Sequence, residues 1–564
     1  MPKSRWSVAI PDCSLPTFLF TSPTHPLGSQ RAFSEAARPD THYLTRDQFR
    51  LWAQRFALGL HRSKHFNKGD RILLFSGNDL FVPVVFMGVL CAGGIFTGAN
   101  PTFVARELAH QLRDSGATYL LCADGSIDTG IEAAKLAGLD ASERVFVYNA
   151  NIYDGPSEGL KGCRYWSDLV APAEDAKSFQ WDDLTGPGES NTTLALNYSS
   201  GTTGVPKGVE ITHKNYVSNT LQVAHISKLQ PDYEERNARS SWLCFLPLYH
   251  AYGQTYYVAN GFHREIPVYV MPKFDFIQFL EYSQKFRITD FTLVPPIAVL
   301  LAKHPAVENY DLSAVERIGS GAAPLGRDVS VQIEKRVGTG LNMKQGWGMT
   351  ECTCSLLGWD FDAISTSAAV GEPNPNCEAK IMSEDGTQEI MTRGPSSVGE
   401  LWCRGPNVMK GYWRNPKATA ETLTSDGWLK TGDIAYLDEQ GMFFIVDRKK
   451  ELIKVKGNQV APAELEALLL EHPDIADAAV IGMPTEDGDE KPRAFIVRQG
   501  GESAQKLTED EVKRFVDGKV TRYKRLAGGV EFVDVIPKNP SGKILRRQLR
   551  DVTRERMRGE GARL

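Results

Sequence analysis

The chain has 564 residues, of which 42% are hydrophobic and 24% are charged, and its formal net charge is -5. This length exceeds what one hydrophobic core supports, so two to four domains are expected. The composition is typical of a globular enzyme, and the negative charge argues against a nucleic-acid-binding protein. The 9 cysteines are scattered without a Cys-x-x-Cys pair, which indicates neither a zinc site nor a disulfide framework and favours a reducing compartment.

The N-terminal third alternates apolar, strand-like segments with helical stretches. Residues 80–99 carry no charge, which is long enough to raise the possibility of a membrane span. Pro83 and the Gly93-Gly94 pair interrupt this stretch, so a buried helix, a turn and a short buried strand are expected instead. We see no secretory signal at the N-terminus. The alternation predicts an α/β fold with parallel sheets and helices on both faces.

A loop rich in hydroxyls and glycines follows the alternating segment Leu194–Tyr198, which predicts a half-buried strand, and precedes Thr212, a good helix N-cap. Glycine lets the backbone approach a ligand, hydroxyls and backbone N–H groups bind phosphate oxygens, and Lys207 supplies positive charge. Pro206 stands where a Walker A loop needs its second glycine, so we predict a phosphate loop of another kind rather than a flexible surface turn. The expected phosphate-binding positions are Ser199, Ser200, Gly201, Thr202, Thr203, Gly204 and Lys207.

The C-terminal part shows a change of pattern. Residues 399–403 predict a strand in a smaller β-rich region, and the highly charged segment 447–456 predicts an exposed linker. The apolar pattern then restarts, with Pro462 suited to a first helical turn and Thr508 followed by Glu511 as a capping box. We therefore expect a domain at residues 1–447, a hinge at 448–456 and a small α+β domain at 457–564.

Several short motifs after the loop carry groups suited to nucleotide chemistry. Thr350 could bind a phosphate oxygen and Glu351 a Mg²⁺ ion. A close-packed turn begins at Gly321, against which a flat base could lie, and Asp433 sits on a turn where it suits ribose hydroxyls. Lys543 lies on a loop that can deliver a cation. Taken singly, each has an ordinary structural explanation, but together they fit one mechanism.

His250 is a candidate carboxylate-binding or gating residue, although a lone histidine is more often structural. The other ordinary explanations are a tight core turn for the segment at Gly321, a helix N-terminal acid for Glu351, and an Asx-turn for Asp433. Lys543 also begins a basic run, and such runs are usually solvated helix faces.

Over nearly its whole length the chain resembles the adenylate-forming superfamily, which includes acyl- and aryl-CoA synthetases, beetle luciferases and the adenylation domains of peptide synthetases. The motifs that carry the resemblance are SSGTTGVPKG, GAAP, QGWGMTE, GYW, GWLKTGD, DRKKELIKVKG, APAELE and PSGKILRR. The subgroup similar to 4-coumarate–CoA ligase and to fungal phenylacetate ligases fits best. The resemblance implies a large N-terminal domain of two parallel-rich α/β sheet subdomains and a small β-rich region, followed by a small mobile α+β domain.

The resemblance also assigns roles. Trp347 would stack on adenine, and Asp433 and Arg448 would hold the ribose. Lys543 would bridge the acyl carboxylate and the α-phosphate, whereas Lys454 and Gln459 would serve the second half-reaction and Lys450 the hinge. The nucleotide-binding set is Gly321, Ala322, Ala323, Gln345, Gly346, Trp347, Gly348, Met349, Asp433 and Arg448.

The wall of the acid pocket is expected to combine residues from three motifs, namely Tyr249, His250, Ser320, Gly346, Cys352, Thr353, Cys354 and Ser355. Aryl ligases of the family often read Thr-Glu-Ala-Gly-Pro where this chain reads Thr-Glu-Cys-Thr-Cys. Thr353 in place of glycine is expected to narrow one wall. Arylacetate, cinnamate-type and medium-chain fatty acids all remain open.

The implied reaction converts a carboxylic acid and Mg·ATP to acyl-AMP and pyrophosphate, and then transfers the acyl group to coenzyme A. A stand-alone enzyme that loads a carrier protein and a luciferase-like oxygenase are the alternatives. We expect no nucleic-acid partner, no membrane span, and a monomer or weak homodimer. The C-terminal Ala562-Arg563-Leu564 resembles the Ser-Lys-Leu peroxisomal address, without which the protein would be cytoplasmic.

Overall fold

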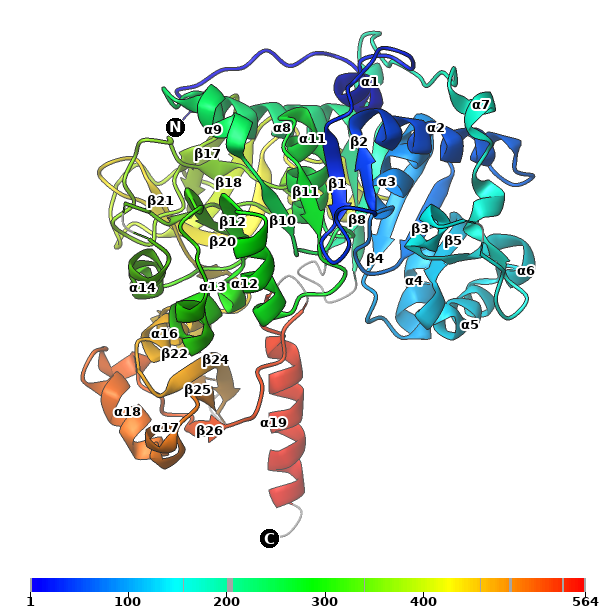
Figure 1. The fold of residues 1–564 in the computed structure, drawn as a ribbon. Coiled ribbons are helices and arrows are strands. Elements are labelled where there is room, and N and C mark those ends of the chain that lie inside the picture. Colours follow the sequence, from blue (N-terminus) through cyan, green and yellow to red (C-terminus); the bar gives the residue numbers. More distant parts are fainter. Residues whose placement is uncertain are drawn as a thin grey trace.

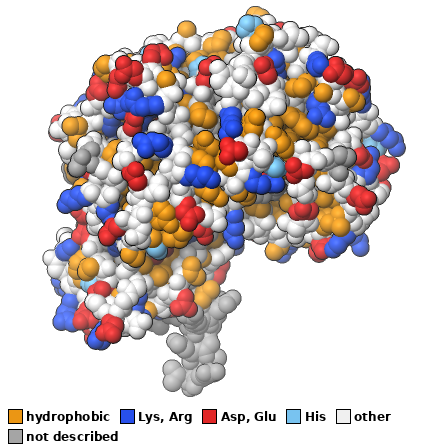
Figure 2. Space-filling model, viewed as in Figure 1, with side chains coloured by type: hydrophobic (Ala, Val, Ile, Leu, Met, Phe, Trp, Pro, Cys, Tyr) orange, Lys and Arg blue, Asp and Glu red, His pale blue; other side chains and the backbone are white. Residues whose placement is uncertain are grey.

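The structure is a computed structural model that describes residues 3–155, 157–199, 206–338, 340–456, 458–485, 489–539 and 542–561. Figure 1 shows a large N-terminal part, coloured blue to yellow, with a smaller C-terminal lobe in orange and red beneath one side of it. Figure 2 shows the same face as a filled surface, where side chains of both charge signs are interspersed.

The first sheet of the large part has the strand order β19-β9-β8-β4-β3-β5-β6-β7 within the described residues. Its strands are β3 (Arg71–Phe75), β4 (Ile95–Ala99), β5 (Ala117–Ala123), β6 (Val145–Tyr148), β7 (Arg164–Tyr165), β8 (Thr193–Ser199), β9 (Lys207–Thr212) and β19 (Gly411–Tyr412). The pairs from β7 to β8 are parallel, whereas β9 and β19 join antiparallel. The helices packed on this sheet are α3 (Val82–Cys91), α4 (Ala105–Ser115), α5 (Ile127–Ala137) and α8 (His213–Lys228), whereas α2 (Arg46–Arg62) packs on α3 and on β1 (Arg31–Glu35) and β2 (Tyr43–Thr45) of the second sheet.

The uncharged stretch at residues 80–99 folds as expected. Every residue of α3 is buried, and so is every residue of β4, with a turn between them at Gly93. Within the described chain, no helix is long and apolar enough to cross a membrane. Thr212 caps α8, because its side chain accepts a hydrogen bond from the Asn215 N–H.

The second sheet has the order β14-β13-β12-β10-β11-β1-β2. Its strands are β1 (Arg31–Glu35), β2 (Tyr43–Thr45), β10 (Trp242–Cys244), β11 (Val268–Val270), β12 (Asp290–Leu293), β13 (Arg317–Ser320) and β14 (Lys344–Gln345). All pairs are parallel except β1 with β2. The helices that accompany it include α12 (Phe276–Lys285), α13 (Pro295–Lys303) and α14 (Arg327–Val337). The two predicted α/β sheets are therefore present.

A third, antiparallel sheet forms the smaller β-rich region. Its strands are β17 (Glu378–Met382), β18 (Gly399–Arg404), β20 (Leu429–Leu437) and β21 (Phe443–Arg448). The strand expected at residues 399–403 is β18. Asp433 on β20 pairs directly with Arg448 on β21. The last strand thus ends where the expected hinge begins.

The C-terminal lobe is an α+β unit with its own hydrophobic clusters, separate from the cluster of the large part. It contains β22 (Ile453–Val455), β23 (Asn458–Val460), α16 (Pro462–Leu470), β24 (Ile475–Pro484), β25 (Glu490–Arg498), α18 (Glu509–Asp517), β26 (Val530–Phe532) and α19 (Arg546–Gly561). Pro462 starts α16 and Thr508 forms the expected capping box with Glu511. The predicted hinge, 448–456, lies where the two sets of clusters adjoin.

Lys303, the last residue of α13, fastens the lobe to the large part. Its Nζ donates hydrogen bonds to the main-chain oxygens of Leu470 and Ile475 at 2.7 and 2.6 Å. Leu470 is the last residue of α16 and Ile475 begins β24, so Lys303 lies at the C-terminus of α16, where a cation also interacts favourably with the helix dipole. Burial lowers the pKa of Lys303 to about 8, so the ammonium form predominates at neutral pH.

We expect Lys303→Met, which keeps the apolar stem, to loosen the lobe without unfolding either core. Losing a charge-assisted contact worth roughly 1.4 kcal/mol should make trypsin cut the 448–456 linker about tenfold faster. Lys335→Met is the matched control, because Lys335 is an exposed lysine in the last turn of α14. Equal cleavage rates in both variants would rule out this anchoring role.

Candidate active site

Glu351 stands where the first sheet meets the segment after β14. Its carboxylate is buried, and Oε1 accepts hydrogen bonds from Ser199 Oγ at 2.9 Å and from Tyr412 OH at 3.0 Å. Ser199 ends β8 and Lys207 begins β9, so they flank the predicted phosphate loop. Lys207 Nζ lies 4.8 Å from the centre of the Tyr412 ring. The two described ends of the loop therefore adjoin the predicted metal-binding carboxylate.

The middle of the phosphate loop lies outside the described residues. This applies to Ser200, Gly201, Thr202, Thr203 and Gly204. Their role in binding phosphate stays a prediction.

The carboxyl ends of β13 and β14 form a second side of the site, as is usual for ligand sites of open α/β sheets. The Gly346 N–H donates to Ser320 O at 2.9 Å, and the Gly321 N–H donates to Leu293 O at 3.2 Å. The Gln345 side chain bonds both the N–H and the carbonyl of Leu325, at 3.0 and 2.8 Å. This amide closes the turn that contains Gly321, Ala322 and Ala323, in which Ala322 takes a left-handed φ of 75°.

Gly348 is required by the tight turn that links Trp347 to Glu351. A Cβ atom at Gly348 would lie 1.7 Å from the carbonyl oxygen of Cys354, so the two backbones touch. Thr350 and Glu351 begin the short helical turn that follows Met349. The glycine thus lets the chain fold back and bury Glu351.

Trp347 and Arg448 both contact Asp433. The Trp347 indole N–H donates to Asp433 Oδ2 at 2.8 Å, and Arg448 Nε lies 3.0 Å from Asp433 Oδ1. The Asp433 carboxylate raises the pKa of Arg448, so the guanidinium group of Arg448 stays protonated. The structure therefore brings together the three residues expected to bind adenine and ribose.

Lys543 reaches this cleft from the small lobe. The adjacent Gly542, at φ 84°, packs against α13, since a Cβ there would lie 2.9 Å from Pro296 Cδ. Burial, together with a smaller effect of the Arg448 charge, lowers the pKa of Lys543 to about 8, although Asp433 and Glu351 act in the opposite sense. Burial likewise lowers the pKa of His250 to about 4, with a smaller effect from Lys543. His250 is therefore neutral at pH 7, and its Nδ1 accepts the Tyr252 N–H at 3.2 Å.

Lys454 and Gln459 lie elsewhere. They face each other across the β22–β23 hairpin and both are exposed. In the part of the chain that the structure describes, no hydrogen bond or ion pair joins either side chain to the cleft around Glu351. Lys450 lies just beyond Arg448, the last residue of β21, within the segment expected to be the hinge. The lobe orientation seen here presents Lys543, not Lys454, to the cleft.

The residues expected in the acid pocket differ in their exposure to solvent. Tyr249, His250, Cys354 and Ser355 keep some exposed surface, and Ser320 ends β13 with a buried hydroxyl. Cys352 and Thr353 have none: Cys352 Sγ lies 3.7 Å from Cys403 Sγ, and Thr353 Oγ1 donates to Asn407 O at 2.7 Å.

Thr353 therefore does not narrow an open cavity wall, contrary to expectation. Its left-handed backbone, with φ at 66°, turns the hydroxyl toward the segment after β18. For a β-branched residue this conformation carries strain of roughly 1–3 kcal/mol. The hydrogen bond to Asn407 offsets part of that strain.

Sequence reasoning missed Tyr412 and Asn407. Asn407 is fully buried, and its Nδ2 donates to the carbonyls of Cys352 and Ser355, at 3.0 Å each. Both residues belong to the stretch before and within the GYW motif, which carried the resemblance but received no role. The available signal was the hydroxyl-bearing ring of Tyr412 inside a motif that had already been singled out.

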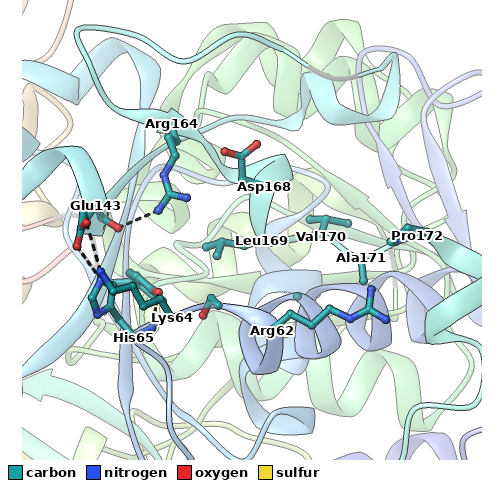
Figure 3. Close-up of a pocket in the computed structure, with 13 residues that line it drawn as sticks. Arg62, Lys64, His65, Glu143, Arg164, Asp168, Leu169, Val170, Ala171 and Pro172 are labelled. Atoms are coloured by element: carbon teal, nitrogen blue, oxygen red, sulfur yellow. Dashed lines mark hydrogen bonds and ion pairs between the residues drawn. The ribbon is translucent and has the colours of Figure 1, made fainter.

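A separate cavity of about 580 Å³ lies beside the C-terminal end of α2, in the first sheet's half (Figure 3). Three of its polar residues pair with one another: His65 Nε2 lies 2.7 Å from Glu143 Oε2, and Arg164 Nη2 donates to Glu143 O at 3.1 Å. None of the residues expected in the active site lines it. The described side chains also contain no group of three or more His, Cys, Asp or Glu that could hold a metal ion.

Two family descriptions match the chain. Residues 27–413 match the AMP-binding enzyme family, and residues 464–543 match the AMP-binding enzyme C-terminal domain. The chain is 38% identical over 561 residues to 4-coumarate:CoA ligase 1 of Petunia hybrida, covering 96% of this chain and 95% of that protein. The chain therefore belongs to the AMP-binding enzyme family. Within it, this protein is an ATP-dependent, AMP-forming acid–thiol ligase of the acyl- or aryl-CoA type.

One similar enzyme has been solved both with ATP and in the apo form. ATP-bound MatB from Rhodopseudomonas palustris superposes with a TM-score of 0.81 at 26% identity, covering 96% of this chain and 99% of that chain. Apo MatB from the same organism has a TM-score of 0.70 at the same identity and coverage. This chain therefore superposes more closely on the ATP-bound form than on the apo form.

We expect Gly348→Ala to damage the site more than the fold. The added methyl must push the Cys354 backbone away, which should cost about 1–3 kcal/mol and displace Glu351 and Trp347. ATP affinity, measured by calorimetry, should fall at least tenfold while the far-ultraviolet circular dichroism is retained. Gly125→Ala is the comparison variant, since that glycine is exposed, follows β5 and has no atom near the position of an added Cβ. A Gly348→Ala protein with normal ATP affinity would show that the turn tolerates a side chain.

Proposed function

We propose that this enzyme activates an aryl acid, of the cinnamate or arylacetate type, and transfers it to coenzyme A. The relatives named as 4-coumarate–CoA ligases support an aryl substrate. Two tyrosines near the expected acid pocket support it as well. A Cβ atom at Gly321 would lie 3.6 Å from the hydroxyl of Tyr252, and Tyr249 packs on Gly98. A medium-chain fatty acid is the competing substrate class.

One observation carries the proposal: the small lobe places the Lys543 amine close enough to Asp433, Glu351 and Arg448 for their charges to act on it. A carboxylate that attacks the α-phosphate of ATP brings two anions together. A cation between them offsets their repulsion, which is the main task of an enzyme in this kind of phosphoryl chemistry. In this proposal Lys543 contacts the acid and the α-phosphate, and Thr350 contacts the same phosphate.

Residues around the cleft would hold the nucleotide in the same proposal. Trp347, with its N–H fixed by Asp433, would lie against adenine, and Asp433 with Arg448 would bind the ribose. The turn of Gly321, Ala322 and Ala323, closed by Gln345, would pack on the base edge. The loop from Ser199 to Lys207 would bind the β- and γ-phosphates.

Mg²⁺ fits this donor set. Glu351 offers one buried carboxylate, and Mg²⁺ is commonly bound by one or two carboxylates together with substrate phosphates and water. When bound, the ion would neutralise phosphate charge. Glu351 would hold it, while Ser199 and Tyr412 hold the carboxylate through Oε1.

The thiol step needs different neighbours at the same cleft. We propose that the lobe, residues 457–564, rotates about a hinge at 448–456 that includes Lys450, and brings Lys454 and Gln459 to the acyl-AMP. Their exposed positions on the β22–β23 hairpin leave them available for that movement. His250, neutral at pH 7, would then border the path of the thiol. The C-terminal tripeptide, which lies outside the described residues, would direct the protein to peroxisomes.

The direct test combines an acid panel with a variant. 4-Coumarate, phenylacetate and octanoate are each supplied with ATP, Mg²⁺ and coenzyme A, and AMP release is compared with the mass of the acyl-CoA product. We expect an aryl thioester, and Lys543→Ala should lower acid-dependent ATP–pyrophosphate exchange about 10²- to 10³-fold. Thiol attack on supplied acyl-AMP should change only a few-fold. Equal losses in both half-reactions would refute the separate role of Lys543.

AMP release without an acyl-CoA product would favour a carrier protein as the acceptor. Light emission with a luciferin analogue and oxygen, in the absence of coenzyme A, would favour a luciferase-like oxygenase. Octanoyl-CoA as the main product would replace the aryl acid with a medium-chain fatty acid.

The pH profile of the first half-reaction should report on Lys543. Its pKa is about 8, so the ammonium form required in the proposal is lost as pH rises through that value. ATP–pyrophosphate exchange should therefore decline above pH 8, by about tenfold per pH unit. Coenzyme A is absent from this assay, so thiol ionisation does not contribute. Lys543→Arg keeps its charge at high pH and should lack the alkaline decline even though its rate is low; a decline unchanged in that variant would assign the profile to another group.

A further inference from the structure

The segment 407–413 ties the Glu351 turn to the strand that begins with Lys207. The Met409 N–H donates to Glu351 O at 2.8 Å, beside the two Asn407 hydrogen bonds to the same turn. On its other side, the Lys410 and Trp413 N–H groups donate to the carbonyls of Glu210 and Gly208 on β9, at 3.0 and 2.8 Å. The segment thus sets the distance between the end of the phosphate loop and the predicted metal ligand.

Tyr412 is the residue of this segment that contacts both sides with its own side chain. Its ring lies under the Lys207 ammonium at 4.8 Å, within the range of a cation–π contact. Its hydroxyl donates to Glu351 Oε1 at 3.0 Å. Its backbone pairs with Val209 in β9, and the residue is 7% exposed. Ring and hydroxyl therefore serve two different groups of opposite charge.

Packing alone does not account for the hydroxyl. A phenylalanine would fill the same space, so the oxygen contributes something besides volume. With Ser199, it supplies two donors to a single oxygen of the carboxylate. Among the residues that the structure describes, none donates to Glu351 Oε2. The pair of donors fixes the carboxylate so that its second oxygen is left for another ligand.

We propose that Tyr412 is a positioning residue that couples the phosphate and metal subsites of this enzyme. The ring holds Lys207 in place for the phosphates, and the hydroxyl orients Glu351 so that Oε2 meets the cation of Mg·ATP. This inference rests on the proposed roles of Lys207 and Glu351 in Mg·ATP binding. It separates two functions within one side chain, so the two can be removed one at a time.

Tyr412→Phe keeps the ring and removes the hydroxyl. It should weaken binding of ATP in the presence of Mg²⁺ by at least about tenfold, as expected for one lost hydrogen bond to a charged group. Binding of ATP in the presence of EDTA should stay within about twofold, because Lys207 keeps its aromatic partner. Isothermal titration calorimetry without any acid measures both affinities, since no turnover occurs under those conditions.

Tyr412→Leu removes both contacts. It should weaken ATP binding with EDTA as well, by about 2- to 10-fold, because the Lys207 ammonium loses its cation–π partner. Tyr282→Phe is the matched control: Tyr282 lies on α12, where its ring stacks on Phe286, far along the chain from the cleft residues. Its affinities should equal those of the unaltered protein. A melting temperature within a few degrees of the unaltered protein verifies that each variant is folded.

The outcomes distinguish this inference from the proposed function. If the unaltered protein binds ATP no more tightly with Mg²⁺ than with EDTA, the proposed metal role of Glu351 fails. If Mg²⁺ strengthens binding and Tyr412→Phe behaves like the unaltered protein, the coupling role of Tyr412 alone is overturned. Equal weakening of both affinities in Tyr412→Phe would reduce Tyr412 to a packing residue and overturn it too.

Discussion

The structure depends on bringing a cation from one lobe to carboxylates of the other. Lys543 enters a cleft that already holds Asp433, Glu351 and Arg448, and burial there lowers its pKa to about 8. An ammonium group more exposed to water would be solvated and would offset the repulsion between two reacting anions less. A more deeply buried one would lose its proton at neutral pH. The burial of Lys543 lies between those two limits. The rest of the fold holds the Lys543 ammonium group near the charged groups of the large part.

Two parts with separate hydrophobic clusters contribute to this cleft. The carboxyl ends of β8, β13 and β14, together with the β20–β21 pair, fix the large-part residues in a common cleft. The buried side-chain amides of Asn407 and Asn219 both donate to the carbonyl of Ser355 and so fix the turn after Glu351. The small lobe has its own hydrophobic clusters, so the rotation proposed above would not expose the main core.

Much of this was predictable from the sequence where local chemistry determines the structure. The capping residues Thr212 and Thr508 and the buried helix and strand at residues 80–99 follow from rules that act over a few residues. The convergence of Trp347, Asp433 and Arg448 came from the family resemblance, since no local rule links positions so far apart. The inward turn of Thr353 depends on its left-handed backbone and on Asn407, and neither was visible in the motif.

The Lys303 contact has a consequence for how freely the lobe surface can vary. Its acceptors are main-chain oxygens at residues 470–475, which every amino acid carries. The side chains along that stretch can therefore differ among relatives without weakening the contact between lobe and large part, provided that the backbone at the end of α16 keeps its conformation. The donor must be a cation, so Lys303 cannot vary in the same way. We therefore expect much less sequence variation at position 303 than at residues 470–475.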